Sequence, residues 1–419
     1  MAMPTPPPTH EQHGWSCMPG DILDLIFERL LAQSWRDITD ELAAGAVCAW
    51  WRAALLKHRR SAAGSRRVEH LAPWLLLDGR AHEEGGDVGY FHDLRRRRTH
   101  AVAIPGPGVN DDFLFVGSSH GWLVAADRSS NLHALNTITR AVVPLPPAAT
   151  LQGIEPVLVG VRADIACYYV KERLNVNGKR YKWATVEKVA AGKLHYRRYK
   201  KVVLSSDPSA GGECTAVLVE KNLKHFSFAR ADRAFVYLDC VHHDGRFYTV
   251  TDTGAVEAWD LCRPDLARAP APETVVRHGA RSENRRYLVS APWGDLLLVQ
   301  KPPVACSDEE PSFSQQRRDV IMVDRVDLAR RRLSPVANLC GYGLLLAPHG
   351  DAVWVAAHEL PGLGENCICF AAARKDWTLY CAGVYDLDAG TIQPLDASLE
   401  SFMEETGDHP IWITRKVII

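Results

Sequence analysis

The stretch GRFYTVTDTGAVEAWDL, Gly245–Leu261, contains the unit on which most of this chain is built. A run of β-forming residues is followed by a short turn of Thr, Asp and Gly, and a second run ends in an aromatic residue followed by Asp260. Parts of this layout recur at Pro73–Arg80, Asp111–Asp127, Arg285–Lys301 and His349–Gly362. Short β-forming runs separated by Gly, Pro, Asp and Asn predict an all-β domain from about Ala72 onward.

The ends of the second runs share a further feature, an aromatic or aliphatic residue followed by Asp or Asn. The instances are Leu135-Asn136-Thr137, Trp259-Asp260-Leu261, Val326-Asp327-Leu328 and Tyr385-Asp386-Leu387. A side-chain oxygen at such a point can accept a hydrogen bond from the backbone a few residues on and so set a turn. Each acid or amide is therefore predicted to start the turn to the next strand.

Repeated hairpin units of weak identity predict a β-propeller over residues 72–419. At roughly 50 residues per blade, this stretch holds about seven blades, and six is the alternative. A radial arrangement also leaves only short, protected strand edges. A β-sandwich with an additional domain would need fewer and longer strands. The stretch from Thr150 to Cys240 is irregular and contains a Lys-rich hairpin, NVNGKRYKWATVEKV.

The N-terminal part has helical character instead, beginning with MPGDILDLIFERL, Met18–Leu30. Pro19 suits the first helical position, and Asp21 suits the first turn, where the helix dipole favours negative charge. The apolar residues form two rows of spacing four, with one residue outside both: Ile22, Ile26 and Leu30; Leu23, Phe27 and Leu31; and Leu25. A helix that is apolar on most of its surface needs burial on more than one side.

A second helical run is predicted at Ile38–Leu56, and the chain then becomes basic. The predicted organisation is a disordered Pro-rich tail over 1–14, a helical module over 15–60, a basic linker over 61–71 and the β domain over 72–419. An interface on the helical module predicts that four residues are exposed in the isolated chain, namely Pro19, Ile22, Ile26 and Trp51. A module that only caps the β domain predicts that they are buried.

Charge and composition exclude several classes of partner. The formal net charge of the chain is −1, so nothing global indicates nucleic acid or an anionic membrane. No apolar run approaches the roughly 18 residues that a membrane span needs. The 11 cysteines are odd in number and scattered, which favours free thiols and an intracellular setting in the cytoplasm, the nucleus or both.

Two basic runs have both an ordinary and a specific interpretation. Lys57–Arg67 reads as the end of a helix and a solvated linker, and a bipartite nuclear-import signal is the alternative. Arg95–Arg98 is predicted on an exposed turn. Neither run has the flanking aromatic residues or the basic domain that a nucleic-acid surface needs.

Signals for an enzyme are weak. Gly117-Ser118-Ser119-His120-Gly121 matches G-x-S-x-G, but WLVAAD follows it as a strand, whereas a nucleophile elbow needs a helix there. The match is therefore predicted to be a hairpin turn. No catalytic residue and no cofactor is predicted, because no Walker-type or dinucleotide-type glycine loop is present.

Metal ligation is not predicted either. Cys367 and Cys369 are expected to alternate across NCICF on opposite strand faces, which would prevent joint ligation, and core packing is the favoured interpretation. His242 and His243 precede the hairpin turn Asp244-Gly245 and are expected in a solvated loop.

The N-terminal module resembles the F-box. The residues that carry the resemblance are Met18, Pro19, Asp21, Ile22, Leu23, Ile26, Leu30, Val47, Cys48, Trp51 and Arg52. Together with LLLDGR, SSHGWLVAAD, LDCVHHDGRFYTVTDTGAVEAWDL and GVYDLDAGTI, the whole chain resembles the plant F-box proteins that carry a KIB-type, kelch-like β-propeller. The commonest first residue of the motif is Leu, and this chain has Met18 there, a swap that conserves volume.

The resemblance implies a substrate receptor of an SCF ubiquitin ligase that has no catalytic role of its own. The implied partners are a Skp-type adaptor, a cullin reached through it, and an unidentified client protein. The implied adaptor-binding residues are Met18, Pro19, Ile22, Leu23, Ile26, Leu30, Val47, Cys48 and Trp51.

Client binding is expected at the loops on one end of the propeller, with aromatic anchors. The candidate anchors are Trp122, Trp293 and Trp354, each of which can equally belong to the core of a blade. The alternative function is a free-standing propeller that acts as a scaffold, a ligand-binding protein or a hydrolase-like enzyme, with helices that only cap it. A propeller of WD repeats, suggested by Trp259-Asp260, would be a relative in fold with the same functional meaning.

Overall fold

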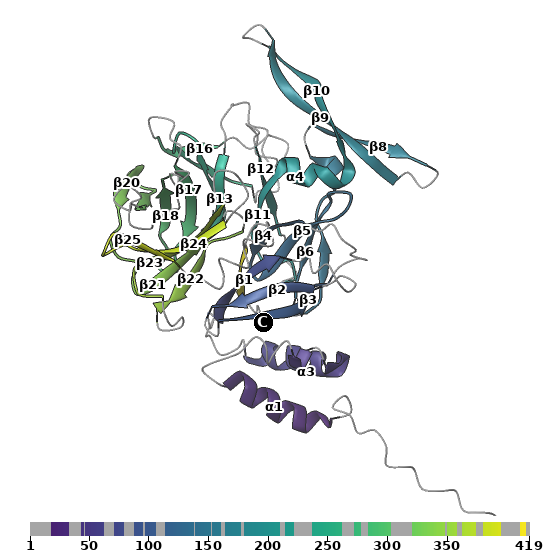
Figure 1. The fold of residues 1–419 in the computed structure, drawn as a ribbon, viewed down its shortest axis with the longest axis vertical. Helices are drawn as coiled ribbons and strands as arrows, with labels where there is room; N and C mark the ends of the chain where they lie inside the picture. The colour runs from purple at the N-terminus through teal and green to yellow at the C-terminus, as the bar shows by residue number, and fades with distance from the viewer. Residues whose placement is uncertain are drawn as a thin grey trace, which may run out of the picture.

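The computed structural model describes residues 18–32, 43–45, 47–62, 71–78, 88–94, 97–105, 114–137, 139–151, 153–160, 164–176, 180–209, 214–221, 237–261, 272–277, 284–302, 321–347, 350–357, 363–373, 380–394 and 411–415. Within these residues, two helices near the N-terminus precede seven β-sheets (Figure 1). The predicted change from helical to β structure is therefore confirmed in outline. The predicted tail over 1–14 and most of the predicted linker lie outside the described residues.

The helices α1 (Gly20–Ala32) and α3 (Ala49–Ala62) pack against each other. Leu23 and Phe27 form one i, i+4 row on α1, and Trp51 and Leu55 form the matching row on α3. All four side chains are buried, and the rings of Phe27 and Trp51 meet edge to face with centroids 5.8 Å apart. The second helical run predicted at 38–56 is helical at residues 43–45 and 47, breaks at Cys48 and continues as α3 to Ala62, further than predicted.

Three of the sheets consist of four antiparallel strands in chain order. They are β4 (Leu114–Ser119), β5 (Trp122–Ala126), β6 (Leu132–Leu135) and β7 (Val142–Pro144); β13 (Tyr237–His243), β14 (Arg246–Thr251), β15 (Val256–Trp259) and β16 (Glu273–Val276); and β17 (Arg285–Ser290), β18 (Leu296–Lys301), β19 (Met322–Asp327) and β20 (Arg332–Pro335). The predicted unit Gly245–Leu261 forms β14 and β15, and the predicted unit Arg285–Lys301 forms β17 and β18.

Three further sheets depart from that order. The strands β1 (Leu71–Asp78), β2 (Val88–Asp93) and β3 (Arg98–Ala103) are completed by the distant strand β26 (Ile411–Arg415), which pairs with β1. The strands β11 (Tyr199–Leu204) and β12 (Ala216–Glu220) form a two-stranded sheet. A five-stranded sheet has the order β22 (Val353–Ala356), β21 (Tyr342–Leu346), β23 (Cys367–Ala373), β24 (Tyr380–Asp386) and β25 (Thr391–Pro394).

Neighbouring sheets share their cores in succession. The strand β4 contacts β26 and β11, β13 contacts β11 and β17, and β22 contacts β26. One apolar cluster joins β4–β6 to β11 and β12, another joins β13–β16 to β17 and β18, and a third joins β17–β19 to β21 and β23. Sheets that pack side by side around a common centre are expected for a β-propeller and differ from the two facing layers of a β-sandwich.

The seventh sheet projects away from the others (Figure 1). It has the order β10 (Arg180–Ala190), β9 (Asp164–Val176) and β8 (Ile154–Val159), and it contains the predicted Lys-rich hairpin. The short helix α4 (Leu194–Arg198) follows it and leads back to β11. The irregular sequence between Thr150 and Cys240 therefore includes a sheet that lies outside the succession formed by the other six.

Several predicted turns are found. The G-x-S-x-G match is a hairpin turn between β4 and β5, in which His120 and Gly121 both have positive φ, 52° and 81°. The predicted side-chain turns are confirmed at three strand ends, where a side-chain oxygen accepts hydrogen bonds from backbone N–H groups: Asn136, Asp327 and Asp386. Arg97 and Arg98 are exposed at the turn between β2 and β3, as expected.

Two expectations about local structure are wrong. Cys367 and Cys369 lie two residues apart on β23 and therefore point to the same face, where both pack into one apolar cluster. Their burial, which was predicted, raises the pKa of both thiols. His242 and His243 are not in a solvated loop, because they are the last two residues of β13 and His243 is buried.

Candidate binding surfaces

The helix pair presents an apolar face to solvent. Ile22 and Leu25 on α1 are 45% and 57% exposed, Trp50 at the start of α3 is 55% exposed, and Val47 before it is 41% exposed. Pro19 is also exposed. The cause lies in the sequence of α1, which is apolar on more sides than α3 can cover.

The predicted adaptor-binding residues divide between this face and the helix core. Pro19, Ile22 and Val47 are exposed, whereas Met18, Ile26 and Cys48 are half-buried against the core. Leu23 and Trp51 are buried, with 0% and 6% exposure, so the expectation that Trp51 is exposed is wrong. The exposed indole is that of Trp50, which the motif-based assignment missed. The side chain of Leu30 lies outside the described residues.

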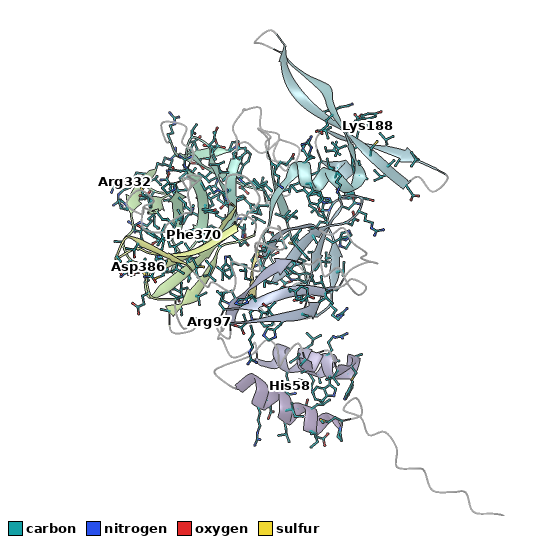
Figure 2. All side chains as sticks on the ribbon, in the orientation of Figure 1. His58, Arg97, Lys188, Arg332, Phe370 and Asp386 are labelled. Atoms are coloured by element: carbon teal, nitrogen blue, oxygen red, sulfur yellow. The ribbon has the colours of Figure 1, made fainter. Side chains whose placement is uncertain are left out.

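A polar contact fixes α3 against α1 next to the core. His58 Nε2 lies 2.6 Å from Asp24 Oδ1, and Lys57 Nζ lies 3.5 Å from Asp24 Oδ2. Figure 2 labels His58 on the helix pair. The hydrogen bond from His58 is the main cause of a pKa of Asp24 below its ordinary value, and the charge of Lys57 adds to it.

A buried charge network lies where strands from several sheets meet. Lys201 Nζ of β11 lies 2.8 Å from Asp239 Oδ1 of β13 and 3.9 Å from Asp351 Oδ1, just before β22. Ser119 Oγ at the end of β4 donates to Asp351 Oδ2 at 2.6 Å. The side chains of Lys201 and Asp239 are only 5% and 6% exposed. One cation therefore connects carboxylates from two other sheets.

The carboxylates keep Lys201 charged in spite of its burial. Burial lowers the pKa of Lys201, but the charges of Asp239 and Asp351 outweigh that effect and hold this pKa above its ordinary value. Sequence reasoning missed this network. A possible signal is the strand YKKVVL itself, where a lysine stands inside an otherwise buried run. A buried lysine needs a paired acid.

Of the three predicted client anchors, Trp122 belongs to the core. Its side chain is 0% exposed, and its Nε1 donates to Asp207 Oδ1 at 3.0 Å. It lies on β5 in the cluster that joins β4–β6 to β11 and β12. Its assignment as a client-binding residue is therefore corrected, because no face of the indole is available to a partner.

The other two anchors lie together. Trp293 in the turn between β17 and β18 and Trp354 on β22 meet edge to face, with ring centroids 5.0 Å apart. Tyr342, the first residue of β21, completes the group at 6.0 Å from Trp293 and 6.3 Å from Trp354. All three are half-buried. We call Trp293, Tyr342 and Trp354 the aromatic patch.

Hydrogen bonds fix the two indoles of the aromatic patch. Trp293 Nε1 donates to Asp295 Oδ2 at 2.9 Å, and Trp354 Nε1 donates to the Ser290 carbonyl at 2.8 Å. Ser290 Oγ lies 2.8 Å from His243 Nδ1 at the end of β13. The patch thus spans the junction of two sheets, and the contact between Ser290 and His243 ties it to a third.

Within the described residues, no group of three or more His, Cys, Asp or Glu side chains is arranged to hold a metal ion. No described helix combines the length and apolar character needed to cross a membrane. What the described surfaces offer is therefore an apolar helical face and a rigid set of aromatic rings, both suited to binding a partner.

Comparison with known proteins gives three findings. Residues 91–386 match the family model described as the KIB1-4 beta-propeller. The match begins after the helix pair and does not include it. A curated relative, F-box protein At1g49360 of Arabidopsis thaliana, is 24% identical over 140 residues. That alignment covers 33% of this chain and 26% of the relative, so the chain spans only about a quarter of its length.

Solved structures show weaker likeness. TolB from Acinetobacter baumannii has a TM-score of 0.35 at 10% identity, covering 88% of this chain and 73% of its own. A putative 6-phosphogluconolactonase from Bacteroides fragilis has a TM-score of 0.33 at 11% identity, covering 82% of this chain and 98% of its own. Scores this low do not establish a shared function.

Proposed function

The chain belongs to the KIB1-4 β-propeller family, and we propose that it is the substrate-recognition subunit of an SCF-type E3 ubiquitin ligase. In this role the helix pair is an F-box that docks on a Skp-type adaptor, and through it on a cullin. The propeller holds a client protein for ubiquitination. The name of the Arabidopsis relative supports the F-box assignment.

The observation that carries the proposal is the exposed apolar face of the helix pair. Four large apolar side chains are more than two-fifths exposed within one small module: Ile22, Leu25, Val47 and Trp50. The described part of the chain has only five other large apolar residues that are exposed. Leu158, Val159 and Tyr169 lie on the projecting β8–β10 sheet, and Met322 and Leu328 lie on β19 and in the turn after it. A contiguous apolar surface of this kind marks a protein interface.

We also propose that the propeller has six blades. The support is the succession of contacts from β26 to β4, β11, β13, β17 and the β21–β22 hairpin, and back from β22 to β26. The β8–β10 sheet is then an insertion rather than a blade. This arrangement favours the lower of the two blade numbers expected from length.

The proposed role needs no catalytic residue from this chain. The recruited ligase carries out ubiquitin transfer, and the receptor supplies proximity by holding the client near the transfer site. An SCF ligase works inside the cell, so the proposal places the chain in the cytoplasm, the nucleus or both. A stand-alone propeller scaffold or ligand-binding protein remains the competing function, and it predicts no adaptor complex.

The test is co-purification of the full chain with a Skp-type adaptor. We expect a stoichiometric complex with the wild type and its loss with Ile22→Asp, because the charge removes apolar contact at the centre of the exposed face. Asp suits the first turn of a helix, so α1 itself should persist. The matched control is Met322→Asp, which changes an equally exposed apolar residue on β19, 44% exposed.

Three outcomes decide between the functions. A complex that survives Met322→Asp and is lost with Ile22→Asp supports the receptor. No complex with the wild type would leave the stand-alone propeller. Loss of the complex together with loss of the propeller's thermal transition would show that Ile22→Asp acts by unfolding, and Leu25→Asp then replaces it.

A further inference from the structure

The two indoles of the aromatic patch have little left to offer a partner except their rings. Both indole N–H groups are already bonded within the protein, to Asp295 and to the Ser290 carbonyl. These bonds come from the same turn, so the two rings are held before any partner arrives. A partner that meets this surface therefore contacts π faces and edges, and little conformational freedom is lost on binding.

The charges next to the patch are negative. Asp244, in the turn after β13, is exposed, and Asp295 lies in the turn that carries Trp293. Burial lowers the pKa of His243, while the charges of Asp244 and Asp295 act in the opposite direction. The net pKa of His243 is below its ordinary value, so this imidazole is neutral at pH 7 and does not offset the carboxylates.

The arginines of the neighbouring turns are already paired with acids. Arg246 and Arg331 both contact Glu273, at 3.4 Å and 2.5 Å, and Arg330 contacts Asp327 at 3.1 Å. Glu273 carries one negative charge for two guanidiniums, so the charge of these three arginines is partly compensated, and each arginine is held in an ion pair away from the aromatic patch. The surface combines electron-rich rings with the two carboxylates Asp244 and Asp295.

We propose that the aromatic patch binds an arginine side chain presented by a segment of the client protein. A guanidinium stacks on the aromatic rings and directs its N–H groups to Asp295 and Asp244. This inference rests on the proposed client-binding role and names the chemical group that the propeller recognises. Arginine suits the site better than lysine, because its planar guanidinium can stack on a ring and donate bidentate hydrogen bonds at the same time.

The probe is N-acetyl-arginine methylamide, with N-acetyl-citrulline methylamide as its neutral isostere. The full chain is labelled with 5-fluorotryptophan and observed by fluorine NMR, both alone and mixed with the unlabelled Skp-type adaptor. Trp293→Phe and Trp354→Phe serve only to assign two of the 12 tryptophan resonances. A stacked cation that contributes about 2 kcal/mol corresponds to a dissociation constant of about 30 mM, so the titration runs to about 200 mM at constant ionic strength.

We expect the resonances of Trp293 and Trp354 to shift with the arginine compound and not with citrulline. Asp295→Asn keeps an oxygen that accepts the Trp293 N–H while removing the charge, and it should weaken binding about three- to tenfold. Asp244→Asn should act in the same direction. The matched control is Asp164→Asn at the exposed start of β9, which should change nothing.

Equal shifts with citrulline, shifts confined to other tryptophans, or no shift at all would overturn the inference. If the chain binds the adaptor but does not respond to the arginine compound, the receptor function stands and only the proposed recognition of arginine is ruled out. An arginine response in a chain that binds no adaptor removes the receptor function and leaves a cation-binding propeller. The two proposals therefore fail separately.

Discussion

At the scale of single residues, Lys201 has the largest predicted effect on stability. Its ammonium group is buried between Asp239 and Asp351. Lys201→Met leaves those carboxylates without their cation, and we expect a loss of about 3–5 kcal/mol in the free energy of unfolding. Denaturant unfolding, followed by fluorescence, measures the loss.

Two variants control for this result. Lys171→Met removes a partly exposed ion pair with Glu155 and should cost about 1 kcal/mol or less. Asp239→Asn in the Lys201→Met background removes one of the stranded charges and should recover part of the stability. Equal losses for Lys201→Met and Lys171→Met would contradict the role of burial.

The tryptophans show where residue-scale prediction stops. The sequence predicted the same two alternatives, client anchor or blade core, for Trp122, Trp293 and Trp354, because an indole serves a blade core and a binding surface equally well. Their contacts separate them: Trp122 is fully enclosed, while the other two lie at a junction between sheets. Likewise, Trp50 and Trp51 differ by one position on a helix, about 100° of rotation, which decides which indole faces α1.

At the scale of elements, the contact between α1 and α3 should depend on pH through Asp24. Its pKa is lowered in the folded chain, chiefly by the hydrogen bond from His58. A lowered carboxyl pKa contributes stability above the ordinary value and loses it as pH falls through the folded value. Asp24→Asn should therefore speed hydrogen exchange in α1 and α3 near pH 6, with the difference closing below about pH 4.

The matched control for Asp24 is His58→Gln, which keeps a donor of similar reach. In that background the imidazole that bonds the carboxyl group is gone, so Asp24→Asn should have a smaller effect at every pH. An undiminished effect would assign the stabilisation to Lys57 instead, which lies 3.5 Å from the same carboxyl group.

Elements with local signals were predicted well, and those without were not. The hairpins at His120-Gly121 and Asp244-Gly245 follow from turn chemistry that neighbouring residues supply. The Lys-rich hairpin was also predicted, and β9 and β10 form it. Its projection from the other sheets was not predicted, because periodicity describes which residues pair and carries no information about where the pair points.

At the scale of the whole molecule, the pairing of β26 with β1 joins segments more than 330 positions apart. The register aligns Leu75 with Trp412 and Trp74 with Ile413. No local pattern predicts such a pair. The sequence predicted a ring of hairpin units, but the partner of the first sheet and the order of strands around β21 depend on packing between distant segments.

If this pairing closes the ring, damage at β26 should weaken every sheet. Trp412 is 0% exposed and packs with Leu75 of its own sheet and with Leu345 and Val355 of the β21–β22 hairpin. Its Nε1 donates to the Leu346 carbonyl at 3.1 Å. Trp412→Ala should cost about 3–5 kcal/mol. Trp412→Phe, which fills most of the space and loses the N–H, should cost less. Hydrogen exchange should then rise in β13–β16 as much as in β1–β3, whereas a rise confined to β1–β3 would show that the sheets unfold independently and that β26 only completes its own sheet.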